Sequence, residues 1–144
     1  MSATRPLPTV IGPTENALRA LLVHVLSDSA ICTYEAWVAM SSAANDAAEG
    51  PGAMNWRAAL ANRLAKPLPF VDEVVERLRK AGLIDSSGAV TDRGAAELAA
   101  ARAAVGEVSS AVVADIPQPD QDVARRVLDK IRLNAEDHLR AATR

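Results

Sequence analysis

The stretch VDEVVERLRKAGLI, residues 71–84, decides the fold of this chain. Four of its apolar residues recur at i, i+3, i+4 and i+7, which is the spacing of one buried helix face: Val71, Val74, Val75 and Leu78. Gly82 follows them, and glycine is the residue that most often stands just after a helix. The stretch therefore predicts a helix from about Phe70 to Ala81.

The chain beyond this helix is predicted to turn back on itself. Residues 83–91, LIDSSGAVT, contain a glycine-centred turn between two short apolar runs and predict a miniature β-hairpin. Thr91 then fits the N-cap of a long helix in which Leu98, Val105 and Val112 recur every seven residues. That repeat is typical of a helix packed lengthwise against another, and Pro117 ends it.

Three shorter helices are predicted before residue 65 and one more near the C-terminus. The third of them, WRAALANRL at residues 56–64, places Trp56, Leu60 and Leu64 on one stripe. Prolines at positions 6, 8 and 13 predict an extended arm over the first dozen residues, and residues 45–52 are predicted as a polar loop. The predicted N-caps are Thr14, Thr33 and Asn55, and the last helix is predicted to start around Asp120.

Three short helices followed directly by a hairpin form the layout of a winged helix, in which the helix before the hairpin enters the major groove of DNA. Residues 56–64 and 71–84 resemble the scaffold helix, recognition helix and Gly-Leu wing entry of the multiple antibiotic resistance regulator (MarR) family of bacterial transcription factors, with an actinobacterial-like sequence and a shortened wing. Residues 90–98, VTDRGAAEL, are similar to that family's Leu-Thr-x-x-Gly return from the wing. The resemblance runs from about Leu7 to the C-terminus.

The resemblance implies an all-α fold with a small β-hairpin wing, in a six-helix dimeric architecture. It implies three parts: an N-terminal arm and dimerisation helix over residues 1–32, a DNA-binding lobe over 33–93, and two helices that complete the dimerisation lobe over 94–144. It further implies a homodimer that binds a pseudo-palindromic operator. Such proteins often release DNA when a small phenolic or other lipophilic effector occupies a cleft between the lobes.

Two features depart from the family's pattern. The family's wing carries an Asp-x-Arg motif whose arginine enters the minor groove, whereas residues 86–88 at this tip are Ser-Ser-Gly and include no cation. The outer face of the predicted recognition helix carries Asp72, Glu73 and Glu76. Nonspecific DNA affinity comes from cations that meet phosphates, so such a face disfavours generic binding, although Glu73 or Glu76 can accept a hydrogen bond from cytosine N4.

The candidate site residues fall into three groups. The candidate DNA contacts are Arg57, Arg63, Lys66, Glu73, Arg77, Lys80 and Arg93. The alternative for them is a solvated helix surface with Glu73–Arg77 and Glu76–Lys80 pairs. The candidate effector contacts are His24, Trp37 and Trp56, for which the alternatives are core tryptophans and an interior or interface histidine. The dimerisation residues are Leu7, Val10, Ile11, Val105, Val112, Val113, Ile116, Val127 and Ile131.

Composition and charge favour a binding protein over an enzyme. The chain has 16 Lys and Arg and 18 Asp and Glu, a net charge of −2, so no global basic field indicates a nucleic-acid partner. Residues 51–93 are the net basic part, with 7 basic and 5 acidic side chains. The P-loop, dinucleotide-binding, zinc-protease and nucleophile-elbow motifs do not occur, so no catalytic activity, cofactor or metal is expected.

Cysteine usage predicts the compartment. Cys32 stands alone and cannot form an intramolecular disulfide, and residues 1–10 lack the apolar run of a secretory signal. We therefore expect a cytoplasmic protein with no membrane partner. Cys32 has no flanking cation and no second cysteine nearby, which favours a buried structural thiol over a redox sensor.

The competing hypothesis keeps this fold and discards DNA. A short uncharged wing and an acidic helix face also fit a winged-helix module that binds a protein or a small molecule. The two hypotheses differ in whether the basic residues around the predicted recognition helix contact DNA phosphates.

Overall fold

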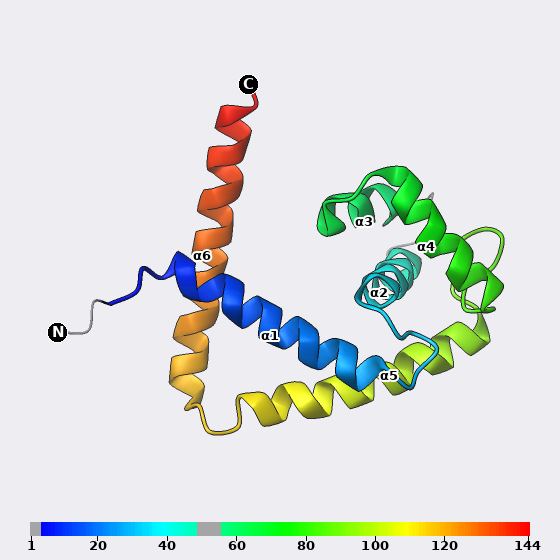
Figure 1. The fold of residues 1–144 in the computed structure, drawn as a ribbon, viewed down its shortest axis with the longest axis horizontal. Helices are drawn as coiled ribbons and strands as arrows, with labels where there is room; N and C mark the ends of the chain where they lie inside the picture. The colour runs from blue at the N-terminus through cyan, green and yellow to red at the C-terminus, as the bar shows by residue number, and fades with distance from the viewer. Residues whose placement is uncertain (1–3, 49–55) are drawn as a thin grey trace. The chain divides into compact units, whose positions relative to one another are not determined.

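The computed structural model describes residues 4–48 and 56–144, and the described chain is almost entirely helical. Its helices are α1 (Pro8–Leu26), α2 (Tyr34–Ala48), α3 (Trp56–Leu64), α4 (Leu68–Lys80), α5 (Asp92–Val112) and α6 (Gln118–Ala142) (Figure 1). The chain divides into two compact units, residues 1–106 and residues 107–144. Each unit is described by itself below.

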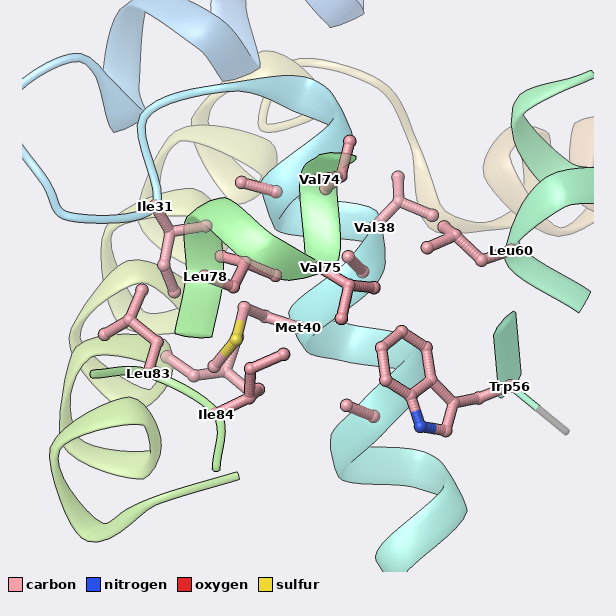
Figure 2. Packing of buried hydrophobic residues seen from close by; sticks show 14 of the residues in the cluster. Ile31, Val38, Met40, Trp56, Leu60, Val74, Val75, Leu78, Leu83 and Ile84 are labelled. Carbon is pink, nitrogen blue, oxygen red and sulfur yellow. The ribbon is translucent and has the colours of Figure 1, made fainter. Parts of the chain in front are cut away.

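The core of the first unit lies among α2, α3 and α4, which contact one another pairwise, while α1 contacts α2. Figure 2 shows Val74, Val75 and Leu78 of α4 packed near Val38 and Met40 of α2. The remaining large buried residues complete this core from the other elements: Leu26, Ile31, Trp56, Leu60, Leu83, Ile84 and Leu98. Burial of this apolar surface is what holds the short helices together.

The predicted pattern of α4 is confirmed. The four residues at i, i+3, i+4 and i+7 are all buried, and Gly82 has the positive φ of 75° that ends the helix. The amide of Leu83 donates to the carbonyl of Leu78 at 3.0 Å and that of Gly82 to Arg79 at 2.9 Å, so the last carbonyls of the helix are satisfied. Since Leu83 is fully buried, this helix end is fixed in place.

Two of the predicted helix caps are confirmed. Thr33 Oγ1 accepts from the amide of Ala36 at 3.1 Å, and Thr91 Oγ1 accepts from the amide of Gly94 at 3.0 Å. Of the other two predicted caps, Asn55 lies outside the described residues and Thr14 lies inside α1. The C-terminal end of α3 has the same hydrogen-bond pattern as α4, but Ala65 takes the left-handed position with φ 51°.

Three predicted helix limits are wrong. No extended arm precedes α1 up to Thr14: the helix begins at Pro8 and includes Pro13, while Thr14 Oγ1 donates back to the carbonyl of Val10 at 2.6 Å. Proline is tolerated in a first turn, and the hydrogen bond that Pro13 cannot make would go to the carbonyl of the exposed Thr9, which water can hydrate. Helix α2 continues through 45–48, and α6 begins slightly earlier than predicted, at Gln118.

The predicted β-hairpin is not confirmed as a pair of strands. Within the described residues the segment holds one isolated antiparallel bridge, between Ile84 and Val90. Backbone hydrogen bonds flank it, from Thr91 N to Leu83 O at 3.1 Å and from Asp85 N to Ala89 O at 2.9 Å. Because the outgoing chain becomes the cap of α5 at Thr91, too few residues remain for a ladder to extend.

The second unit holds the end of α5, a turn and α6. Gln121 Nε2 donates to the carbonyls of Val113 at 3.2 Å and Ile116 at 2.8 Å, which fastens the turn to the first turn of α6. No residue of α6 is buried. None of the described helices is long and apolar enough to cross a membrane.

Candidate functional site

The outer face of α4, opposite its buried residues, carries the candidate site. Asp72 and Glu73 are exposed and Glu76 is half-buried. Asp72 forms an ion pair with Arg57 of α3, and Glu76 accepts from Arg79 Nη1 at 2.8 Å. Glu76 therefore pairs with Arg79, three residues further along α4. The Glu76–Lys80 pair that the sequence suggested is not formed within the described chain.

Arg57 connects the scaffold helix to the candidate recognition helix. Its guanidinium reaches the Asp72 carboxylate across the α3–α4 contact, and its Nε is buried without a hydrogen-bond partner among the described residues. The charge of Arg57 is therefore largely compensated inside the protein. Its side chain is 31% exposed, which leaves one edge accessible to solvent.

The other candidate cations remain on the surface. Arg63 of α3 donates from Nη1 to the buried Ser42 Oγ of α2 at 3.2 Å, and that hydroxyl donates to the carbonyl of Val38. Lys66, in the connection between α3 and α4, places Nζ 5.5 Å from the centroid of the Phe70 ring. The three remaining cations are exposed: Arg77, Lys80 and Arg93.

The turn after α4 is organised by a carboxylate. Asp85 Oδ1 accepts from the amide of Ser87 at 2.8 Å, from Ser87 Oγ at 2.6 Å and from the amide of Ala89 at 3.1 Å. The hydrogen bond from the Ser87 hydroxyl, followed by that from the Ala89 amide, lowers the pKa of Asp85. The tip is therefore an ordered turn whose anchoring group is anionic.

The candidate effector residues are not gathered in one environment. Trp56 is 5% exposed and belongs to the core, as the alternative reading of the sequence held (Figure 2). Trp37 is half-buried against that core, and His24 is exposed on α1, so His24 is not an interior residue of this chain. Within the described residues, no group of three or more His, Cys, Asp or Glu could hold a metal ion.

The prediction for Cys32 is wrong. The thiol is exposed, while its neighbour Ile31 is fully buried. The core position in this connection is taken by Ile31, and the cysteine beside it faces solvent.

The candidate dimerisation residues are mostly uncovered. In α1 and the residue before it, Leu7 is 49% and Val10 36% exposed. In the second unit, Val112, Ile116 and Val127 are 38–42% exposed. The remaining four are half-buried: Ile11, Val105, Val113 and Ile131.

Sequence reasoning missed the partners that fix this site. Asp72 was placed on the acidic face, but its partner Arg57 is 15 positions away on another helix, beyond any local spacing rule. Ser42 and Asp85 were likewise not singled out. Asp85 had a local signal, since an aspartate that opens a Ser-Ser-Gly turn is a common hydrogen-bond acceptor for that turn's amides.

Comparisons with known proteins identify the fold. Residues 51–123 match a family model described as wHTH-PRTase associated, that is, a winged helix-turn-helix. A Mycobacterium tuberculosis MarR family protein, Rv2887, solved in complex with salicylic acid, is 25% identical with a TM-score of 0.69 over 88% of this chain and 98% of that one. The same protein solved with DNA gives 24% identity and a TM-score of 0.70 over 89% and 98%. No curated protein matches with significance. The predicted MarR-like, winged-helix fold class is confirmed.

Proposed function

Since the chain belongs to the family described as wHTH-PRTase associated and has the fold of a MarR family protein, we propose that it is a DNA-binding, ligand-responsive transcriptional regulator that acts as a homodimer in the cytoplasm. The observation that carries the proposal is the structural likeness over nearly all of both chains to a protein solved with DNA. In this proposal α4 enters the major groove and the protein has no catalytic role.

The uncovered apolar side chains support the homodimer. Along α5, burial declines from Leu98 at 3% exposed to Val112 at 42%. In α6, no residue is buried and Val123, Leu128 and Leu133 are 45–48% exposed. A soluble chain rarely leaves so many large apolar side chains in water, so a second copy of the chain is the proposed cover.

The cations around α4 support DNA as the partner. Five of them are not compensated by an ion pair within the described residues: Arg63, Lys66, Arg77, Lys80 and Arg93. In the proposed complex they contact phosphates on either side of the groove, while the two α4 helices of the dimer stand about 34–36 Å apart, one turn of duplex. The charge of Arg57 contributes less, because Asp72 already holds it.

The proposed effector is a small phenolic or lipophilic compound, by likeness to the protein solved with salicylic acid. An effector that binds one spacing of the two α4 helices better than the other shifts the dimer away from the DNA-compatible spacing. His24 and Trp37 remain the proposed effector contacts, because the side chain of Trp56 is buried in the core.

The proposal is tested by fluorescence anisotropy of the purified protein on duplex DNA from upstream of its own gene, with a scrambled duplex as control. We expect selective binding that weakens as salt rises. Five uncompensated cations per protomer, ten per dimer, set a limit of about −9 on the slope of log K against log salt. Adding salicylate tests the effector separately, and we expect it to weaken the complex.

The competing function, a winged-helix module for a protein or small molecule, is favoured by the cation-free turn anchored by Asp85. Weak binding that ignores sequence would support that function and contradict DNA regulation.

A further inference from the structure

We infer that Glu73 is the base-reading carboxylate of α4 and that it selects a cytosine in each half of the DNA site. This inference rests on the proposed DNA-binding function and adds to it the base that the site recognises. It decides between Glu73 and Glu76, both of which the sequence allows to accept from cytosine.

Ion pairing separates the three carboxylates. Asp72 is held by Arg57 from α3, and Glu76 is held by Arg79 at 2.8 Å. Within the described residues, Glu73 makes neither an ion pair nor a hydrogen bond, and its side chain is exposed. A carboxylate held by a guanidinium is fixed in the direction of that partner and has fewer lone pairs left for a base, whereas both oxygens of Glu73 are available.

Position along the helix favours the same residue. The periodicity of the helix places Glu73 on the side of α4 opposite its buried valines, Val74 and Val75. Glu73 also lies in the N-terminal half of the helix, Leu68–Lys80. In helix-turn-helix proteins the N-terminal residues of the recognition helix contact base edges. Glu76 and Lys80 stand closer to the other end.

The chemistry of the major groove selects cytosine as its partner. An ionised carboxylate only accepts hydrogen bonds, and guanine and thymine present acceptors in the groove that repel it. Adenine offers its N6 amino group beside the N7 acceptor, whereas cytosine offers its N4 amino group with no acceptor of its own beside it. Glu73 therefore contributes discrimination, and the surrounding cations contribute affinity.

The acidic face of α4 is consistent with this role. Asp72 and Glu76 are each neutralised by an arginine partner, so the repulsion between α4 and DNA phosphates comes mainly from Glu73. A charge that repels phosphates everywhere and gains a hydrogen bond at one base pair weakens binding to unmatched sequences. That combination raises the specificity ratio.

The experiment uses the full-length protein and a randomised duplex library, sequenced after selection for bound DNA. Wild type, Glu73→Gln and Glu76→Gln are compared, and melting curves check that the variants fold as wild type does. We expect wild type to enrich a symmetric motif with a C·G pair in each half. Glu73→Gln should lose the cytosine preference at that position by at least about fivefold and shift toward adenine, which glutamine contacts in a bidentate manner.

Glu76→Gln is the matched control, since it removes the same charge from the same helix. It should strengthen binding to all duplexes and leave the motif unchanged. Identical motifs for wild type and Glu73→Gln would overturn the inference while leaving DNA binding intact, as would a Glu76→Gln variant that alters the same position. A wild-type protein that enriches no motif would overturn both this inference and the proposed function.

Discussion

Replacement of Gly94 by alanine tests how the α4–α5 junction is built. A Cβ added at Gly94 would lie 2.0 Å from the carbonyl oxygen, 2.9 Å from the carbonyl carbon and 3.1 Å from the Cα of Leu83. All three are backbone atoms of a fully buried residue, so no side-chain rotation can relieve the contact. The first turn of α5 can therefore approach the end of α4 this closely only with glycine at this position.

The expected cost follows from what must move. Restoring an ordinary carbon–oxygen contact requires a shift of about 1.4 Å, and overpacking of this kind costs about 1–3 kcal/mol or more where backbone is displaced. The Leu83 carbonyl also accepts from the amide of Thr91 at 3.1 Å, a bond worth about 1 kcal/mol that such a shift weakens. Alanine recovers about 1 kcal/mol of helix propensity. The net destabilisation expected for Gly94→Ala is about 1–3 kcal/mol.

The assay is urea unfolding followed by circular dichroism, supported by thermal melts in which the midpoint should fall by roughly 10 °C. Gly106→Ala is the matched control, because Gly106 lies in the same helix and a Cβ there meets nothing within 4 Å. This control should gain up to about 1 kcal/mol. A Gly94→Ala protein as stable as wild type would refute the close approach of α5 to Leu83.

Four further outcomes are expected. Ala65→Gly should stabilise the protein by about 0.5–1 kcal/mol in urea unfolding, because glycine relieves the φ of 51° at the end of α3; no gain would mean that this residue is not strained. Arg63→Ala should reduce the salt slope of DNA binding by about two, because each protomer of the dimer loses one cation, and Arg57→Ala by much less, since Asp72 already compensates Arg57; equal reductions in anisotropy titrations would contradict that assignment. Val112→Asp should shift the protein toward monomer in light scattering, because this 42% exposed valine lies on the proposed interface; an unchanged mass would remove it from there. Asp85→Ala should lower stability more at pH 7 than in acid: the pKa of Asp85 is lowered in the folded protein, so its ionic contribution is present above about pH 4 and is lost as pH falls through the folded-state pKa. A gap in urea midpoints that does not narrow as pH falls would assign the effect to something other than ionisation.

Sequence spacing predicted the helices whose burial follows a local rule. In α4 the four apolar residues and Gly82 agree with one another, and the structure buries the former and gives the latter a positive φ. The threonine caps at 33 and 91 also depend only on residues within three positions, so a local signal was sufficient. Where local signals agreed, element type and limits could be predicted closely.

The failures arise where a local rule competed with a partner or with solvent. Pro13 argues against a helix by propensity, yet α1 includes it, in an exposed stretch where water can hydrate the carbonyl left without a donor. Cys32 has no flanking cation and no second cysteine nearby, which favoured a buried thiol, yet Ile31 takes the core position and the thiol is exposed. The wing was predicted from strand propensity, but the cap at Thr91 consumes the residues that a second strand needs.

The charge of the recognition helix shows the same limit at the site. Counting side chains makes the outer face of α4 strongly acidic, and the i,i+4 rule assigns its partners to the same helix. The structure instead brings Arg57 from α3 to Asp72, a pairing that exists only once the two helices pack. What a groove would meet is therefore one uncompensated carboxylate, Glu73, bordered by cations, and not three. Under the proposed function, the tertiary pair of Asp72 with Arg57 and the local pair of Glu76 with Arg79 leave a site that discriminates between sequences, where three free carboxylates would repel DNA in general.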